Sequence, residues 1–300
     1  MGFLNRKIKK LQESEQFENL GKVTSEKAVD VIRQLGGTEA SSMKSAMIDN
    51  YVLFTSAGSG AGASTIVSNV AYMAATKGLK VIVIDLNIVY PIQHTFLGIK
   101  QEATEQNDLV KYLNGKCTLG EAIDSSHIYS IMYANNRNLY DLITCNSDIA
   151  ITNYNDMISK IRKLFDLIII DCPLILENEI YNNAFYGCDS IYMVWDEGLG
   201  SLTNTDRARR NMSYCGIDSY TKLRVILNKR TYMHYSTYPL KKLNLEMVGI
   251  LPFDVSIIEN SSKAQIFCEK GASNSPNAAE FERNIAKITD KILKIGGLIE

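Results

Sequence analysis

The sequence predicts an α/β fold: a doubly wound, mostly parallel β-sheet with helices on both faces. Two observations support this prediction. From residue 49 onward, short apolar runs that suit buried strands alternate with longer segments of helical periodicity. The first apolar run ends in a glycine-rich loop that leads directly into a helical stretch. Because ligands of such sheets bind at the carboxyl ends of the strands, we expect the functional residues just after the apolar runs.

Composition limits the class of protein. The chain has 300 residues, 46% apolar side chains and a formal net charge of −1, which indicates a globular protein with a large core and no bias toward nucleic acid or another polyanion. Its six cysteines have no CxxC spacing, as expected of reduced thiols. No apolar run reaches the length of a membrane span, and no signal-peptide pattern is present. We therefore expect a cytoplasmic protein.

Residues 1–48 form an N-terminal extension, predicted to be helical, in front of a domain at 49–300. A basic amphipathic helix is predicted at its start, because apolar residues fall on one stripe and basic residues surround it. The apolar residues are Phe3, Leu4, Ile8 and Leu11, and the basic residues are Arg6, Lys7, Lys9 and Lys10. Such a helix would place the protein peripherally at the anionic inner face of the membrane. The alternative is an ordinary helix that docks on the core or on a partner protein.

The glycine-rich loop follows a predicted strand at 51–55 and precedes a predicted helix at 66–75. Glycines let the backbone approach an anion closely, and the start of the helix offers unpaired amides and a positive dipole end. We expect a diphosphate to bind to these residues: Gly58, Ser59, Gly60, Ala61, Gly62, Ala63, Ser64 and Thr65. The two hydroxyl residues could cap the helix or reach a magnesium ion. The alternative is a turn that packs tightly without any ligand.

Further strands and helices are predicted in alternation. Strands are predicted at 81–84, 139–144, 167–171, 190–195, 223–227 and 248–252, and helices at 109–113, 151–164, 205–212 and after Pro276. The strand at 167–171 consists of four apolar residues followed by Asp171, which makes a Walker B pattern. Asp171 is thereby placed at the carboxyl edge of the sheet. There it can accept a hydrogen bond from magnesium-bound water or from Ser64.

These segments resemble, in the same order, the motifs of the MinD/ParA superfamily of P-loop proteins over residues 49–295. The usual deviant Walker A motif, KGGxGK[ST][ST], has two lysines, whose positions are Gly58 and Ala63 in this chain. The form GxGAST, which this chain has, is typical of the CpaE/TadZ group, which localises and assembles Tad-type pili at bacterial cell poles. That group often retains the first lysine, so Gly58 departs even from its pattern.

The resemblance also implies the roles of residues outside the loop. The second strand of the superfamily usually ends in DxD, which here reads Asp85-Leu86-Asn87, so Asp85 is expected near the metal and Asn87 in the place of the acid that positions water. Magnesium would be held, through water, by Ser64, Asp85 and Asp171. Asn228 and Pro252 are expected beside the nucleotide base. The alternatives are a loop cap for Asp85 and an ordinary polar turn for Asn228.

We expect a pseudo-ATPase that binds ATP or ADP with magnesium and hydrolyses it slowly or not at all, and that acts as a localisation or scaffold factor for pilus or other envelope machinery. Without a lysine at Gly58, any homodimer would rest on side-chain packing. One alternative is a ParA-like partition protein that binds DNA through Arg207, Arg209, Arg210, Lys241 and Lys242. Another is an active P-loop ATPase or a bacterial tyrosine kinase, although residues 292–300 contain no tyrosine cluster.

Overall fold

The computed structural model describes residues 49–99, 107–135, 145, 147–231, 243–271 and 275–300. All of them belong to one unit of the chain, Met47–Glu300. The predicted membrane helix, the predicted strand at 139–144, Lys241 and Lys242 lie outside the described residues. In the described part, no helix is both long and apolar enough to cross a membrane.

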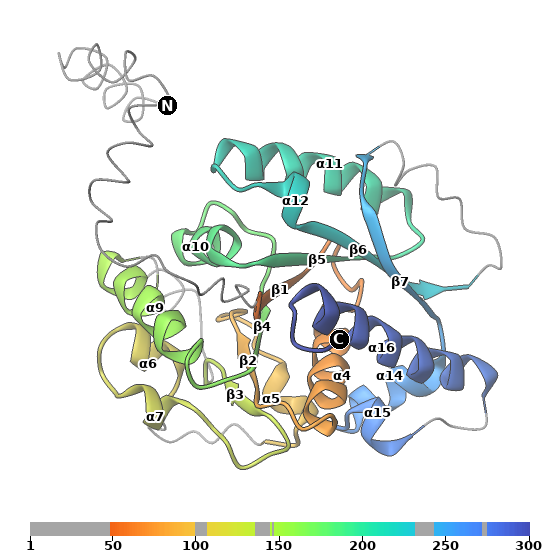
Figure 1. Cartoon of the computed structure of the whole chain (residues 1–300), viewed down its shortest axis with the longest axis horizontal. Coiled ribbons are helices and arrows are strands. Elements are labelled where there is room, and N and C mark those ends of the chain that lie inside the picture. The colour runs from red at the N-terminus through yellow and green to blue at the C-terminus, as the bar shows by residue number, and fades with distance from the viewer. Residues whose placement is uncertain (1–48, 100–106, 136–144, 146, 232–242, 272–274) are drawn as a thin grey trace, which may run out of the picture. The chain divides into compact units, whose positions relative to one another are not determined.

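The domain is built on a seven-stranded sheet in which every neighbouring pair of strands is parallel. The strand order is β3-β2-β4-β1-β5-β6-β7 (Figure 1). The strands are β1 (Tyr51–Ser56), β2 (Val81–Asp85), β3 (Ser130–Met132), β4 (Leu167–Asp171), β5 (Ser190–Trp195), β6 (Leu223–Arg230) and β7 (Glu246–Pro252). The predicted doubly wound parallel fold is confirmed.

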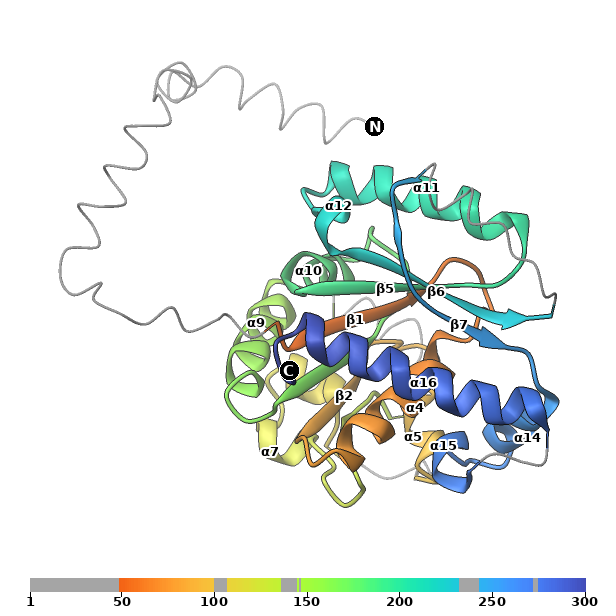
Figure 2. The same ribbon diagram turned by 45° about the vertical axis from the view of Figure 1, so that its right-hand side comes forward.

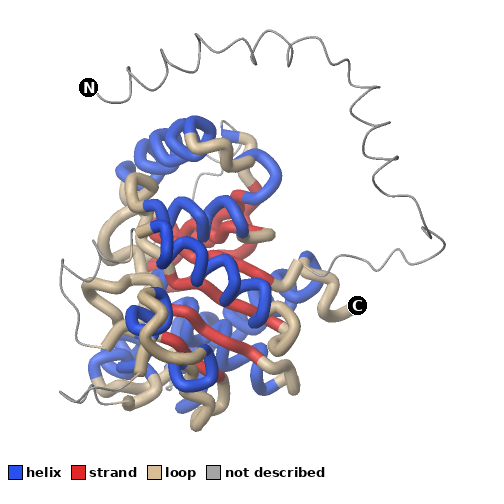
Figure 3. Tube along the Cα trace, turned by 90° about the vertical axis from the view of Figure 1, so that its left-hand side faces the viewer, coloured by secondary structure: helices blue, strands red, loops and turns tan. Residues whose placement is uncertain are grey.

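Helices cover both faces of the sheet (Figures 2 and 3). Alternate residues of β1 point to opposite faces: Tyr51 and Leu53 belong to one buried cluster, and Val52 and Phe54 to the other. The first cluster is covered by α6 (Leu109–Leu113), α7 (Leu119–Ala122), α9 (Asp148–Ile161), α10 (Glu179–Gly187) and α11 (Leu199–Tyr214). The second is covered by α4 (Ala63–Thr76), α14 (Val255–Ser262), α15 (Phe267–Lys270) and α16 (Pro276–Ile295). Both faces of the strands are therefore buried from solvent, which explains their continuous apolar sequences.

Several element boundaries differ from the predictions for local reasons. Helix α9 begins at Asp148, before the predicted start at 151, because the hydroxyl of Ser147 accepts a hydrogen bond from the amide of Ala150 (3.3 Å). Helix α11 is longer than the predicted 205–212. Pro276 is the first residue of α16 and does not merely precede it, since a missing N–H costs nothing at that position.

Strand β6 runs on past the predicted end at residue 227 to Arg230. The prediction placed Asn228 after the strand, and this was wrong. The pairing with β7 shifts between Leu227 and Arg230, and Lys229 within this interval has a positive φ of 57°. Because of this irregularity, β6 extends to Arg230 while the side chains of Asn228 and Lys229 contact the glycine-rich loop.

Two features of the topology position the site. Strand β1 lies between β4 and β5, so the chain that leaves β1 builds one half of the sheet, and the chain that leaves β4 crosses to the other half. Such a reversal opens a crevice at the carboxyl ends of the strands. In the register between β2 and β4, Asp85 and Asp171 lie directly opposite each other at this edge.

Candidate functional site

The glycine-rich loop is held in place from the neighbouring strand β6. Gly62 has φ 97° and serves as the N-cap of α4. The side-chain amide of Asn228 donates a hydrogen bond to the carbonyl of Ala61 (2.8 Å), and a Cβ at Gly62 would overlap with that amide. Glycine is thus required at Gly62 both by the backbone and by the space available.

No side chain caps the first turn of α4. Of the two roles suggested for the hydroxyl residues, helix capping is therefore excluded. The hydroxyl of Ser64 instead hydrogen bonds to the carboxyl group of Asp171. The amides at the start of α4 are left without a side-chain partner, in the arrangement that binds anions at helix N-termini.

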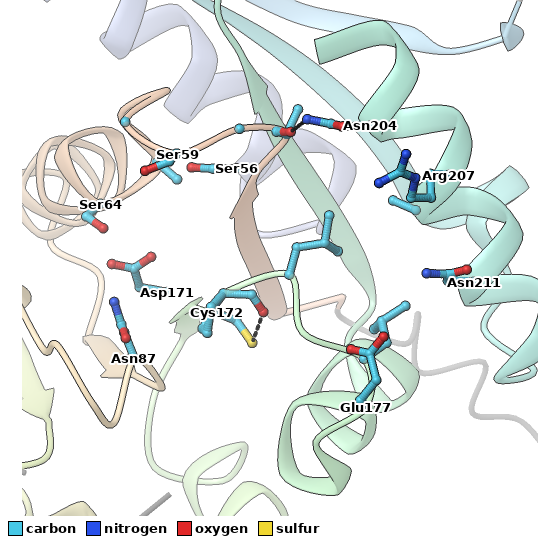
Figure 4. Close-up of a pocket in the computed structure, with 18 residues that line it drawn as sticks. Ser56, Ser59, Ser64, Asn87, Asp171, Cys172, Glu177, Asn204, Arg207 and Asn211 are labelled. Atoms are coloured by element: carbon cyan, nitrogen blue, oxygen red, sulfur yellow. Dashed lines mark hydrogen bonds between the residues drawn. The ribbon is translucent and has the colours of Figure 1, made fainter. Parts of the chain in front are cut away.

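A cavity of about 570 Å³ opens above the loop (Figure 4). It is lined by Ser56, Ala57, Gly58, Ser59, Gly60, Ala63, Ser64, Asn87, Asp171, Cys172, Pro173, Leu174, Leu176, Glu177, Asn204, Arg207, Ala208 and Asn211. Figure 4 shows Ser56, Ser59 and Ser64 on one side and Arg207 and Asn211 on the other. The structure thus brings Asn87, Asp171 and five of the eight predicted loop residues to one cavity, whereas Asp85 is not among the lining residues.

Asp85 is fully buried and turned toward its own loop. Its carboxylate accepts hydrogen bonds from the backbone amides of Asn87 (3.0 Å), Ile92 (2.7 Å) and Gln93 (2.9 Å). These bonds support the alternative role, a cap on the loop that follows β2. Asp85 is therefore poorly placed to face a metal ion in the cavity.

Gln93 is a site residue that the sequence did not reveal. It begins the short helix α5 (Gln93–Phe96) and is fully buried. Its side-chain amide donates to Asp171 Oδ2 (2.6 Å) and to the carbonyl of Ser64 (3.0 Å). Gln93 thereby ties the carboxylate at the end of β4 to the first turn of α4. Nothing in the local pattern of residues 86–99 marks this position, because its partners are distant in sequence.

Burial changes the proton affinity of the two carboxyl groups. Burial, and next the negative charge of Asp171, raise the pKa of Asp85 from 3.8 to about 8, although its three backbone hydrogen bonds oppose this. Burial also raises the pKa of Asp171, against the hydrogen bonds from Gln93 and Ser64. Two neighbouring buried carboxyl groups therefore disfavour a state in which both are ionised.

The donor set fits a magnesium ion only in part. Ser64 and Asp171 lie beside each other on the cavity wall, which suits a water-mediated ion that also binds phosphate oxygens. Within the described ranges, no group of three or more His, Cys, Asp or Glu residues could hold a metal by itself. A bound ion would therefore depend on the phosphate groups of a ligand.

The loop lacks the two lysines, and the structure shows what stands in their places. Gly58 lines the cavity, and a Cβ built on it meets no atom within 4 Å. Ala63 is 5% exposed. Outside this cavity, Lys229 Nζ donates to the carbonyl of Gly60 (2.6 Å). Among the described residues, Arg207 is the cationic side chain that lines the cavity.

A second, smaller cavity of about 260 Å³ adjoins the other side of the loop. It is lined by Gly60, Gly62, Thr65, Asn228, Lys229, Pro252, Phe253, Asp254, Ile257, Ile258, Ser261 and Phe281. The two residues predicted beside a nucleotide base, Asn228 and Pro252, thus share one largely apolar pocket next to the loop. Their contact with a base remains a prediction.

The arginines predicted for DNA contact do not form one surface. Arg209 donates to the carbonyl of Leu243 and lies over the ring of Tyr220, 4.3 Å from its centroid. Arg210 is paired with Asp206 on its own helix. Arg207 lines the cavity. The three arginines are close in sequence, but they lie on different faces of the helix and have different surroundings.

The fold and the loop define a P-loop protein with a nucleotide-sized cavity over its phosphate-binding loop. The family described as AAA domain matches residues 51–205. The chain belongs to this family and to the MinD/ParA superfamily.

Individual relatives agree with this assignment. The chain is 26% identical over 178 residues to the tyrosine-protein kinase CpsD of Streptococcus pneumoniae serotype 4, covering 58% of this chain and 74% of that protein. It is 26% identical over 231 residues to the septum site-determining protein MinD of Helicobacter pylori, covering 71% and 82%. The solved structure of MinD with Mg-ADP from Pyrococcus horikoshii OT3 has the same fold, with a TM-score of 0.65, 18% identity and coverage of 82% and 97%.

Proposed function

We propose that this protein is a nucleotide-dependent localisation or scaffold factor that binds ATP or ADP and hydrolyses ATP slowly or not at all. One observation carries the proposal: a 570 Å³ cavity lies over a well-formed phosphate loop, yet neither lysine position of that loop holds a cation. The backbone amides can still bind phosphate in the ground state. A loop without its lysines cannot neutralise the charge that grows on the phosphates during transfer, so the transition state loses stabilisation.

Ser64 and Asp171 would hold magnesium, which would offset the charge of the β- and γ-phosphates when it is bound with nucleotide. Asn87 lines the cavity where the superfamily usually has the second acid. An amide cannot accept a proton from an attacking water, so Asn87 could orient water but not activate it as a base. The solved Mg-ADP complex of a MinD structure with this fold supports the choice of ligand.

The pilus or envelope role is the finer part of the proposal. It is supported by the GxGAST form of the loop, which resembles the CpaE/TadZ group, and by the basic amphipathic pattern of residues 1–11. In this proposal residues 1–11 bind an anionic membrane surface and the domain recruits envelope or pilus proteins. A homodimer would form through side-chain packing, because Gly58 cannot supply the lysine contact that the superfamily makes across its dimers.

Two measurements on the full chain test the proposal. Equilibrium titration with ATP and with ADP, both with magnesium, should show binding that Asp171→Ala weakens. Co-sedimentation with anionic vesicles should decrease when Lys7, Lys9 and Lys10 are all changed to Gln, with neutral vesicles as the control. Absence of nucleotide binding would refute the proposed nucleotide site. Equal sedimentation of the wild type and of the triple variant with anionic vesicles would refute the membrane role.

A second candidate, an active P-loop kinase or ATPase, is favoured by the similarity to the tyrosine-protein kinase CpsD. It requires the transfer of phosphate from ATP to water or to tyrosine. Incubation with ATP followed by phosphotyrosine and phosphate assays separates it from the first proposal. The DNA-partition alternative has less support, since the described arginines of its cluster point to different partners. Salt-dependent retention of DNA by the full chain would support the DNA-partition alternative.

A further inference from the structure

The charge of the main cavity is unusual for a phosphate site. Its described lining contains the acidic residues Asp171 and Glu177 and a single cationic residue, Arg207. A nucleoside triphosphate carries several negative charges, and the residues of the loop offer it backbone amides and hydroxyl groups but no cationic side chain. Arg207 is therefore the side chain through which the cavity can place a full positive charge near the phosphates.

The position of Arg207 follows from helix α11. Asn204, Arg207, Ala208 and Asn211 are spaced by three and four residues, so they share one face of the helix, and all four line the cavity. The helix is fixed to the base of the loop, because the side-chain amide of Asn204 donates to the carbonyl of Ala57 (2.7 Å). Figure 4 shows Arg207 on the opposite wall from Ser56 and Ser59.

Arg207 is also available, unlike its neighbours. In the part of the chain that the structure describes, its guanidinium has no hydrogen-bond or ion-pair partner, whereas Arg209 is engaged with Leu243 and Tyr220, and Arg210 with Asp206. Arg207 is exposed, so it is not held by packing. A planar guanidinium with five donors suits the oxygens of a phosphate group.

We propose that Arg207 binds the outer phosphate of a bound nucleoside triphosphate from within the same chain, as a contact made in the ground state. This proposal rests on the proposed nucleotide binding and adds to it a preference for nucleotides with more phosphate groups. A contact at the outer phosphate favours ATP over ADP, and ADP over AMP. Glu177, on the same cavity, opposes binding of the anion.

The test is titration of the full chain with ATP, ADP and AMP in magnesium. Arg207→Gln should weaken ATP binding about tenfold or more, as expected for loss of a charged hydrogen bond, with a smaller effect on ADP and none on AMP. Arg210→Gln, on the same helix but outside the cavity, is the matched control and should change nothing. Arg207→Lys should recover part of the loss, and Glu177→Gln should strengthen ATP binding.

The outcomes separate this inference from the proposed function. If the wild-type chain binds no nucleotide, the proposed function fails and the inference with it. If the wild type binds ATP and Arg207→Gln binds it equally well, only the inference is refuted. An equal loss for ATP, ADP and AMP would also refute it, since a general disturbance of the cavity would not depend on the number of phosphates.

Discussion

Replacement of Gln93 by alanine should destabilise the domain more than a typical substitution in a loop. The change removes the hydrogen bond to Asp171 Oδ2 (2.6 Å) and the one to the carbonyl of Ser64 (3.0 Å), both in a fully buried environment. A hydrogen bond to a charged group contributes about 1.5–3 kcal/mol and a neutral one about 0.5–1.5 kcal/mol. We therefore expect the free energy of unfolding to fall by about 2–4.5 kcal/mol.

Urea denaturation of Gln93→Ala and of the wild type at the same pH measures this difference. A double-mutant cycle with Asp171→Ala, which removes the acceptor, isolates the contact, and we expect an interaction energy of about 1 kcal/mol or more. Gln93→Glu is a variant of similar size that turns a donor toward Asp171 into an acceptor, so it should be at least as unstable at pH 8. A loss below about 0.5 kcal/mol for Gln93→Ala, the range of ordinary surface substitutions, would refute the reasoning.

Three further predictions concern the loop and the carboxyl pair. Gly62→Ala should lower the free energy of unfolding by about 1–2 kcal/mol because the backbone there is left-handed, and further because the new Cβ would overlap with Asn228. Urea unfolding measures this loss, and unchanged stability would contradict the prediction. In Gly58→Lys the new side chain has space, and one added charge at an exposed site contributes about 1 kcal/mol, so ATP should bind about fivefold more tightly. Gly58→Gln is the neutral control. Equal affinity of the two variants for ATP would contradict this prediction. Because burial raises the pKa of Asp85 from 3.8 to about 8, and also that of Asp171, the folded state holds a proton that the unfolded state releases. Stability should therefore fall as the pH rises from about 4 to about 8, and unfolding curves across this window should show a smaller slope in Asp171→Asn.

Strands β1, β2, β4 and β5 were predictable because each is a nearly continuous apolar run. Strand β5 matches its predicted range, Ser190–Trp195, and β4 ends at Asp171 as predicted. The glycine loop and Asp171 could be placed together for the same reason, since strand ends of a parallel sheet meet at one edge. Strand β3 was missed because three residues are too few to show a period.

Contacts between distant segments could not be read from the sequence. The bond between Gln93 and Asp171 joins residues 78 positions apart, and the bond between Asn228 and Ala61 joins residues 167 apart. The direction of each arginine on α11 likewise depends on how that helix docks. Asp85 was placed at the correct edge, but its orientation toward its own loop depends on the path of the chain after β2.

In the proposed function, the cavity binds ATP but hydrolyses it slowly or not at all. This proposal is tested most directly by phosphate release from ATP in a single-turnover experiment, with the full chain in excess and magnesium present. We expect ATP to be bound and to remain intact, with phosphate release close to the rate without protein. Rapid phosphate release that Asp171→Ala abolishes would overturn the proposed function, because it would show that the site hydrolyses ATP without the lysines of the loop.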